Sequence, residues 1–163
     1  MTFCLSIMTY AQTPRDRATE LKEQAQSSLN QKDYIKARYL FKKAYEAFAT
    51  RENYPQAIEC GVQANALYVR ENFYKEGFEL CRDMDQLIWA GEQNQKKVFY
   101  DLRFLVNKER LQMYTALKNP AQAKTQLNKL EETANLAKND SLTEVLLYTK
   151  ANYYYTFNQN AQG

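Results

Sequence analysis

The stretch Asp33–Ala44, DYIKARYLFKKA, carries the pattern that decides the fold. Its apolar and small residues recur at i, i+3, i+7 and i+10 and therefore share one stripe of a helix: Tyr34, Ala37, Phe41 and Ala44. Two of the four are alanines, which let another helix approach closely. The Lys and Arg residues between them lie on other faces. The stretch therefore predicts an amphipathic helix that packs against neighbouring helices.

The composition of the whole chain favours an all-α, folded protein. Its 163 residues suffice for one domain with its own core, and 45% hydrophobic with 25% charged residues argues against disorder. Gly (4) and Pro (3) are scarce. The net charge of +3 is too small to indicate a nucleic-acid partner. The chain has no His, which removes the commonest general base and the commonest metal ligand.

Residues 1–11, MTFCLSIMTYA, differ from the rest of the chain. A short apolar run, Phe3 to Met8, is followed by Thr9-Tyr10-Ala11, which is typical of a secretory cleavage site. We interpret 1–11 as a signal-peptide remnant, which predicts an exported, periplasmic protein. The alternative is an N-terminal segment packed on the first helix of a cytoplasmic protein. No run approaches the ~18 apolar residues that a membrane span needs.

Seven helices are expected, separated by short polar turns. The first is expected to begin with Thr13 as cap and Pro14 at its first position. Gly91 is expected to end the fourth helix, and Ser141 with Glu144 to form a capping box for the seventh. The predicted ranges are about 13–29, 34–50, 54–70, 73–90, 94–117, 120–138 and 141–157.

A small residue recurs near the start of every second helix. The four positions are separated by 40, 46 and 40 residues: Ala37, Gly77, Ala123 and Gly163. A polar turn residue precedes each one: Asp33, Asn72, Asn119 and Asn158. One such repeat cannot bury its own apolar stripe, whereas stacked repeats can. The sequence therefore predicts helical hairpins stacked in a common register.

The turn–Tyr–x–x–Ala–x–x–x–Phe–x–x–Ala string at Asp33–Ala44 resembles the second helix of a tetratricopeptide repeat. The resemblance covers about residues 12–163 and implies a right-handed solenoid of antiparallel hairpins. Two features differ from the family. The spacings of 40 and 46 exceed its ~34-residue period, and Gly61, Ala64 and Asn65 stand where its first helix has Trp and Leu-Gly.

The resemblance also implies a concave groove, lined by the first helix of each repeat, that binds an extended peptide or a partner helix. The matching positions are Lys22, Gln26 and Leu29; Val62, Ala66 and Val69; Lys108, Gln112 and Thr115; and Tyr148, Asn152 and Tyr155. The family's clamp for a peptide carboxylate is not built, because Gln26, Gln63, Leu105 and Glu109 replace its charged and amide residues. We expect a ligand held by packing. The alternative is that these residues only stack the repeats.

No residue pattern indicates catalysis, a cofactor or a metal. Cys60 and Cys81 are expected to be buried and too far apart to bridge. Glu131 and Glu132 point about 100° apart on a helix and cannot converge on one atom. We therefore predict a non-enzymatic protein-interaction or scaffold module with a protein or peptide partner. The alternative function is an extracytoplasmic sensory repeat domain of a bacterial signalling regulator.

The last anchor, Gly163, has no following helix in the sequence. Part of the apolar surface of the preceding helix is therefore expected to be uncovered, at Leu146, Leu147, Tyr154 and Phe157. We interpret the chain as the N-terminal part of a longer repeat protein. The alternative is a second copy that covers this end and forms a homodimer.

Overall fold

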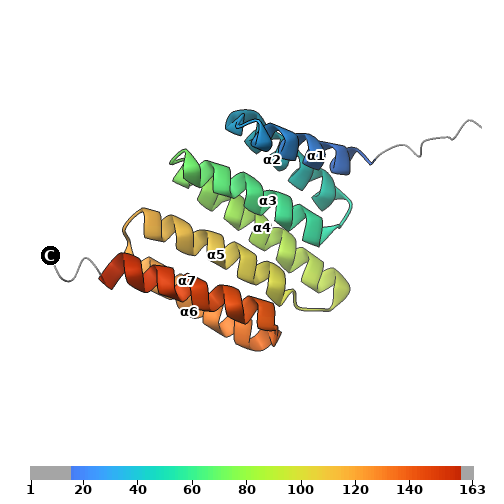
Figure 1. Ribbon diagram of the computed structural model, residues 1–163. Helices are drawn as coiled ribbons and strands as arrows, with labels where there is room; N and C mark the ends of the chain where they lie inside the picture. The colour runs from blue at the N-terminus through green and yellow to red at the C-terminus, as the bar shows by residue number, and fades with distance from the viewer. Residues whose placement is uncertain (1–15, 159–163) are drawn as a thin grey trace, which may run out of the picture.

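The computed structural model describes residues 16–158, and its regular structure within this range is entirely α-helical. The described helices are α1 (Arg17–Asn30), α2 (Tyr34–Thr50), α3 (Tyr54–Arg70), α4 (Tyr74–Gln95), α5 (Tyr100–Ala116), α6 (Pro120–Ala137) and α7 (Asp140–Asn158). They pack as sequential antiparallel pairs, and most contacts join helices that are neighbours in the sequence (Figure 1). The predictions of an all-α protein with seven helices are confirmed. The proposed signal remnant and Gly163 lie outside the described residues.

Helices α2, α3 and α4 begin 20 residues apart, so every second helix is 40 residues apart, as expected for Ala37 and Gly77. Each begins with a tyrosine: Tyr34, Tyr54 and Tyr74. The fourth residue of each helix is small and buried: Ala37, Ala57 and Gly77. At Gly77 an added Cβ would lie 2.8 Å from Met113 Sδ. The small residue at Gly77 therefore lets Met113 of α5 approach α4 closely.

Four turns share one three-residue form, in which the middle residue has a left-handed backbone. These residues are Lys32 (φ 62°), Glu52 (φ 56°), Asn72 (φ 62°) and Lys118 (φ 54°). The next N–H donates to the carbonyl five residues earlier, as from Asn53 to Phe48 at 3.0 Å, which is the Schellman arrangement. In three of the four turns this same residue caps the following helix: Asp33, Asn53 and Asn119.

Several predicted helix ends are wrong. Helix α1 begins at Arg17, with the Asp16 side chain accepting from the Ala18 N–H at 3.1 Å. Helix α4 continues through Gly91 to Gln95, and α5 begins at Tyr100 and not near 94. Asn139, and not Ser141, caps α7, because its side chain accepts from the Ser141 N–H at 3.0 Å.

Gly91 serves close packing and does not end a helix. An added Cβ would lie 2.8 Å from the Phe99 ring and 2.9 Å from the Tyr54 ring. These two rings contact each other, with centroids 5.6 Å apart. The missing side chain at Gly91 therefore lets the start of α3 and the α4–α5 turn meet over α4.

Buried Glu92 holds the junction between α4 and α5. Its side chain is 6% exposed. Its Oε1 accepts from the Phe99 N–H at 2.8 Å and from Arg103 Nε at 2.7 Å, and the carboxylate also pairs with a terminal nitrogen of Arg103. The hydrogen bond from Arg103 lowers the pKa of Glu92 below its ordinary value. The carboxylate fixes the turn and thereby the position at which α5 begins.

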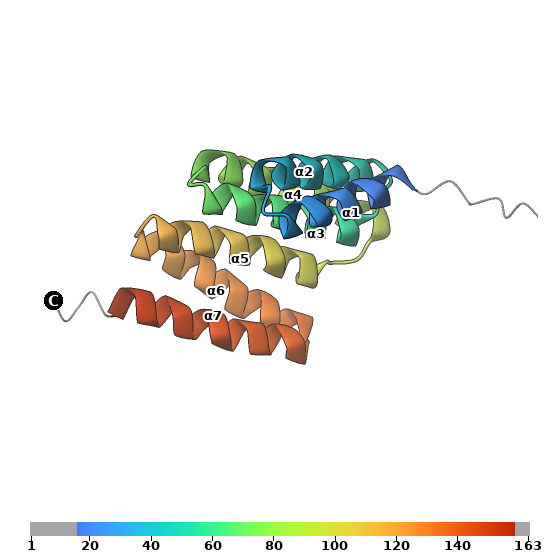
Figure 2. The same ribbon diagram turned by 45° about the horizontal axis from the view of Figure 1, so that its top comes forward.

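The core consists of two clusters that meet on α5. The first joins α1–α4 with Val106 and Met113 of α5. The second joins Phe104 and Leu111 of α5 with α6 and α7. Figure 2 shows the corresponding arrangement, with α5, α6 and α7 below α1–α4. Helix α5 therefore contributes apolar side chains to both core clusters. Among the described residues no helix is long and apolar enough to cross a bilayer.

Candidate functional site

Helices α5 and α7 lie side by side (Figure 1). They border a groove of about 350 Å³. We name it the α5–α7 groove. Its lining residues are Lys108, Leu111, Gln112, Thr115, Ala116, Lys118, Tyr148, Thr149, Asn152, Tyr153 and Thr156. Five of the groove positions expected from the sequence lie here together: Lys108, Gln112, Thr115, Tyr148 and Asn152. The structure thus brings the C-terminal part of the expected groove into one place.

Helical spacing places these side chains on matching stripes. On α5 the lining includes Lys108, Gln112 and Thr115, at i, i+4 and i+7, and on α7 it includes Tyr148 and Asn152, at i and i+4. The neighbouring Leu111 and Tyr153 are buried in the second core cluster. The groove therefore has an apolar floor between polar walls.

Several polar side chains of this groove are open. Among the described residues, Lys108, Gln112 and Asn152 have no side-chain hydrogen bond or ion pair. Lys108 is half-buried, whereas Gln112 and Asn152 are exposed. An ammonium supplies only donors, while each amide supplies both a donor and an acceptor. The groove can therefore hydrogen-bond to a bound segment without first breaking an internal contact.

The N-terminal part of the expected groove is organised differently. Lys22 Nζ lies 2.8 Å from Glu59 Oε2 of α3 and 2.8 Å from Gln56 Oε1. Gln26 donates to Asn30 Oδ1 at 3.1 Å along its own helix. Both polar groups therefore already have partners, and Lys22 ties α1 to α3.

The remaining expected groove positions, four apolar residues of α1 and α3 and Tyr155 of α7, are divided between the core and the surface. Leu29, Val62 and Val69 pack against the first core cluster. Ala66 is exposed on α3, and Tyr155 is 67% exposed on α7 outside the groove lining. None of these five residues lines the α5–α7 groove.

Helix α7 exposes several large apolar and tyrosine side chains. Leu147 is 62% exposed and Tyr148 70% exposed, and Tyr154 is also exposed. The expectation was wrong for Leu146, which is buried in the second cluster, and Phe157 is half-buried. Lys150 is the one charged residue between 145 and 157, and it pairs with Glu131 of α6 at 2.6 Å. An uncharged, tyrosine-rich surface therefore borders the α5–α7 groove.

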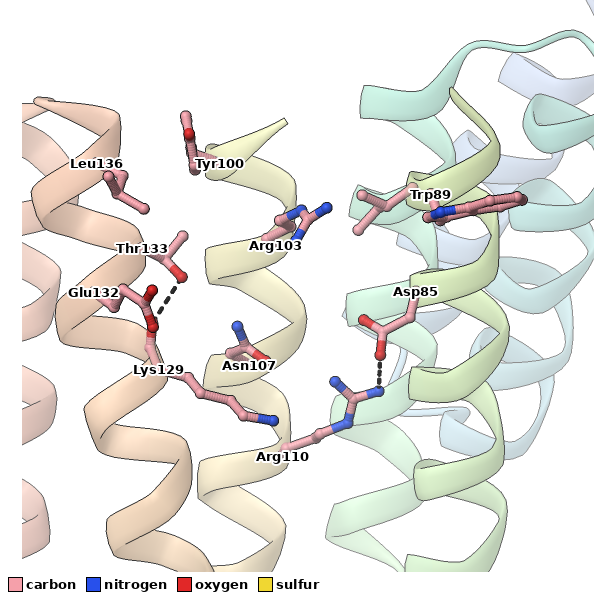
Figure 3. A pocket seen from close by; sticks show the side chains of 11 residues that line it. Asp85, Trp89, Tyr100, Arg103, Asn107, Arg110, Lys129, Glu132, Thr133 and Leu136 are labelled. Carbon is pink, nitrogen blue, oxygen red and sulfur yellow. Dashed lines mark hydrogen bonds and ion pairs between the residues drawn. The ribbon is translucent and has the colours of Figure 1, made fainter. Parts of the chain in front are cut away.

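A second groove, of about 450 Å³, lies over α5 between α4 and α6 (Figure 3). We name it the α4–α6 groove. Its lining is Asp85, Ile88, Trp89, Tyr100, Arg103, Asn107, Arg110, Lys129, Glu132, Thr133 and Leu136. Sequence reasoning missed this groove, because it depends on how far α4 and α6 stand apart. The exposed Trp89, one helical turn after Asp85, was the available signal.

The arginines of the α4–α6 groove are already engaged. Arg110 pairs with Asp85 and donates to the Cys81 carbonyl at 3.0 Å. Arg103 pairs with Glu92 behind the groove. The dashed line between Asp85 and Arg110 in Figure 3 marks one of these contacts. An anionic ligand would therefore have to compete with internal carboxylates for both arginines, which makes this groove the weaker candidate.

Groups that could support catalysis are dispersed or shielded. Cys60 and Cys81 are free and buried, as predicted, and burial raises the pKa of Cys60 to about 11 and of Cys81 to about 12. Both thiols are therefore protonated at neutral pH and poor nucleophiles. Glu131 pairs with α7, whereas Glu132 lines the α4–α6 groove. Within residues 16–158 no group of three or more acidic or Cys side chains is placed to hold a metal ion.

The α5–α7 groove is thus the better candidate site, because the side chains of Lys108, Gln112 and Asn152 are open and its floor is apolar. The resemblance to tetratricopeptide repeats depends on the pattern in Asp33–Ala44 and on the hairpin order of the helices. In comparisons with known proteins, no protein family, no curated protein and no solved structure matches this chain.

Proposed function

We propose that this chain is a tetratricopeptide-like, right-handed stack of helical hairpins that acts as a non-catalytic protein-interaction or scaffold module. The proposed ligand is a peptide or a helix of a partner protein, bound in the α5–α7 groove. One observation carries the proposal: the unpartnered side chains of Lys108, Gln112 and Asn152 stand around an apolar floor. The sequence pattern that resembles the family supports the same function.

The groove chemistry suits a short apolar segment of polypeptide. Leu111 and Tyr153 offer an apolar floor, and Tyr148 adds a largely exposed ring at the edge. Tyrosine is common at binding hot spots because its ring buries a large area while its hydroxyl reaches a polar partner. The amides of Gln112 and Asn152 can serve the N–H and C=O groups of a bound backbone. Lys108 favours an acidic side chain or a carbonyl at one end of the segment.

The test begins with a peptide selected from a random library against the intact chain. Its affinity is then measured by fluorescence anisotropy for the wild type, Tyr148→Ala and Asn152→Ala. We expect each substitution to weaken binding by about tenfold, the effect of ~1.4 kcal/mol. Tyr39→Ala is the matched control, because Tyr39 is an exposed tyrosine on α2 outside the α5–α7 groove.

The variants also separate groove binding from adhesion to the exposed apolar side of α7. Leu147→Ala removes exposed apolar area from α7 without changing the groove lining. Groove binding predicts that this variant keeps the wild-type affinity. Equal affinities for the wild type and both groove variants would contradict the proposal, and so would a loss confined to Leu147→Ala.

A further inference from the structure

A buried amide–carboxyl pair joins α3 to α5 inside the molecule. Asn65 is fully buried, and the Glu109 side chain is only 2% exposed. Asn65 Nδ2 donates to Glu109 Oε2 at 3.1 Å. Asn65 Oδ1 is also buried and has no hydrogen-bond partner. The pair therefore contains one made hydrogen bond and one acceptor that lacks a donor.

Helix α4 encloses the same atoms. An added Cβ at Gly77 would lie 3.0 Å from Asn65 Oδ1, so α4 passes directly over this oxygen. An unsatisfied buried acceptor is costly, and a charged carboxylate with a single hydrogen bond in the same place costs more. A proton on the carboxyl group would remove the charge, and its O–H is a donor of the kind that the amide oxygen lacks.

We infer that Glu109 is protonated in the folded protein and forms a two-hydrogen-bond pair with the Asn65 amide, so that the α3–α5 contact is strongest at acidic pH and weakens as the pH rises. The inference holds for either orientation of the amide. If the amide were turned over, its oxygen would face Glu109 Oε2, and that contact also requires the carboxyl proton.

The surroundings of the carboxyl group favour the neutral form. Burial raises the pKa of Glu109, and the Asn65 hydrogen bond and the Lys108 charge on α5 offset this only in part. From α4 the group that acts electrostatically with Glu109 is the Cys81 thiol, which itself stays neutral. From α3 the facing group is the uncharged Asn65 amide. Arg110, next along α5, is held by Asp85 and the Cys81 carbonyl.

The direction in which stability changes with pH follows from the proton that Glu109 holds in the folded state. A carboxyl group whose pKa is raised on folding stabilises the fold fully below the value of the unfolded chain, and this contribution is lost as the pH rises through the folded value. The chain has no His, so few other groups titrate between about pH 5 and pH 8. The α-amino group is one of them. A slope of stability in this window therefore reports mainly on Glu109.

The test compares urea unfolding at about pH 5 and about pH 8 for the wild type, Glu109→Gln and Glu132→Gln. Gln at 109 supplies the same donor and acceptor as a protonated carboxyl group at every pH. We expect the unfolding equilibrium constant of the wild type to rise at least about tenfold between the two pH values, and that of Glu109→Gln to change less than about threefold. At the higher pH Glu109→Gln should be the more stable protein. Glu132, exposed on α6, is the matched control and should keep the wild-type slope.

Two results would overturn the inference: a wild-type slope retained in Glu109→Gln, or a Glu109→Gln protein that is less stable than the wild type at the higher pH. A second measurement needs no variant. In the wild type, the carbon-13 resonance of the Glu109 carboxyl should remain at its protonated position at about pH 6, above the ordinary range for Glu. Titration of this resonance at the ordinary value would equally refute the inference.

Discussion

At the scale of single residues, two buried glutamates respond to pH in opposite directions. Glu92 is held as a carboxylate by Arg103 and the Phe99 N–H, which lowers its pKa. Its contribution to stability is therefore present above the ordinary value for Glu and is lost as the pH falls through the lower folded value. Glu109 has no such cation and follows the reverse course. Whether a buried carboxyl group is charged thus depends on the cations and hydrogen-bond donors around it.

We expect Glu92→Gln to lower the free energy of unfolding at neutral pH by about 1–3 kcal/mol, because the buried side chain at position 92 loses the charge that strengthens its hydrogen bonds with Arg103 and the Phe99 N–H. Urea titration measures the change. Glu79→Gln is the matched control, since Glu79 is exposed on the same helix. An equal effect of the two substitutions would mean that the α4–α5 junction does not depend on this carboxylate.

At the scale of elements, a left-handed turn residue can be compared with its neighbour by substituting each with glycine. Glu52 adopts φ 56°, whereas its neighbour Arg51 adopts φ −99°. A left-handed backbone costs a non-glycine residue roughly 1–2 kcal/mol, and glycine avoids most of this cost. We expect Glu52→Gly to raise the free energy of unfolding by about 1 kcal/mol and Arg51→Gly to lower it by roughly 0.5–1 kcal/mol. Thermal unfolding measures both, and a loss of stability in Glu52→Gly would contradict this account.

Local signals predicted the starts of α2, α3 and α6, while contacts between distant residues determine features that the sequence did not reveal. Asn53 and Asn119 cap α3 and α6, whose starts agree with the predicted ranges 54–70 and 120–138, because a cap depends only on the next few residues. Gly91 was misread as a helix end. Glycine suits either a left-handed turn or a close approach, and only Tyr54 and Phe99 identify which applies here.

The candidate site was likewise predictable from the sequence only in part. The spacing of Lys108 and Gln112 on α5 was enough to place both on one wall of the α5–α7 groove. The same reasoning did not predict that Lys22 forms an ion pair with Glu59, because Glu59 lies on another helix. The α4–α6 groove had no local signal beyond an exposed Trp89, because it arises from the separation of two helices.

At the scale of the whole molecule, the two core clusters predict that stability is not uniform. Helices α2 and α3 pack against neighbours on both sides, whereas α7 leaves one apolar side uncovered. In a stack of helices each part depends mainly on its nearest neighbours, so the least covered helix should open most readily. The shared helix α5 should open only when one of the two clusters does.

Native-state hydrogen exchange tests this with one core substitution in each cluster. Leu146→Ala removes a buried side chain from the second cluster, and Ile58→Ala one from the first; each should cost about 2–5 kcal/mol. We expect Leu146→Ala to reduce amide protection mainly in α6 and α7, and Ile58→Ala mainly in α1–α4. The wild type should show at least about tenfold less protection in α7 than in α2 and α3. If both variants lowered protection equally in all seven helices, the clusters would form one cooperative unit and α5 would not separate them.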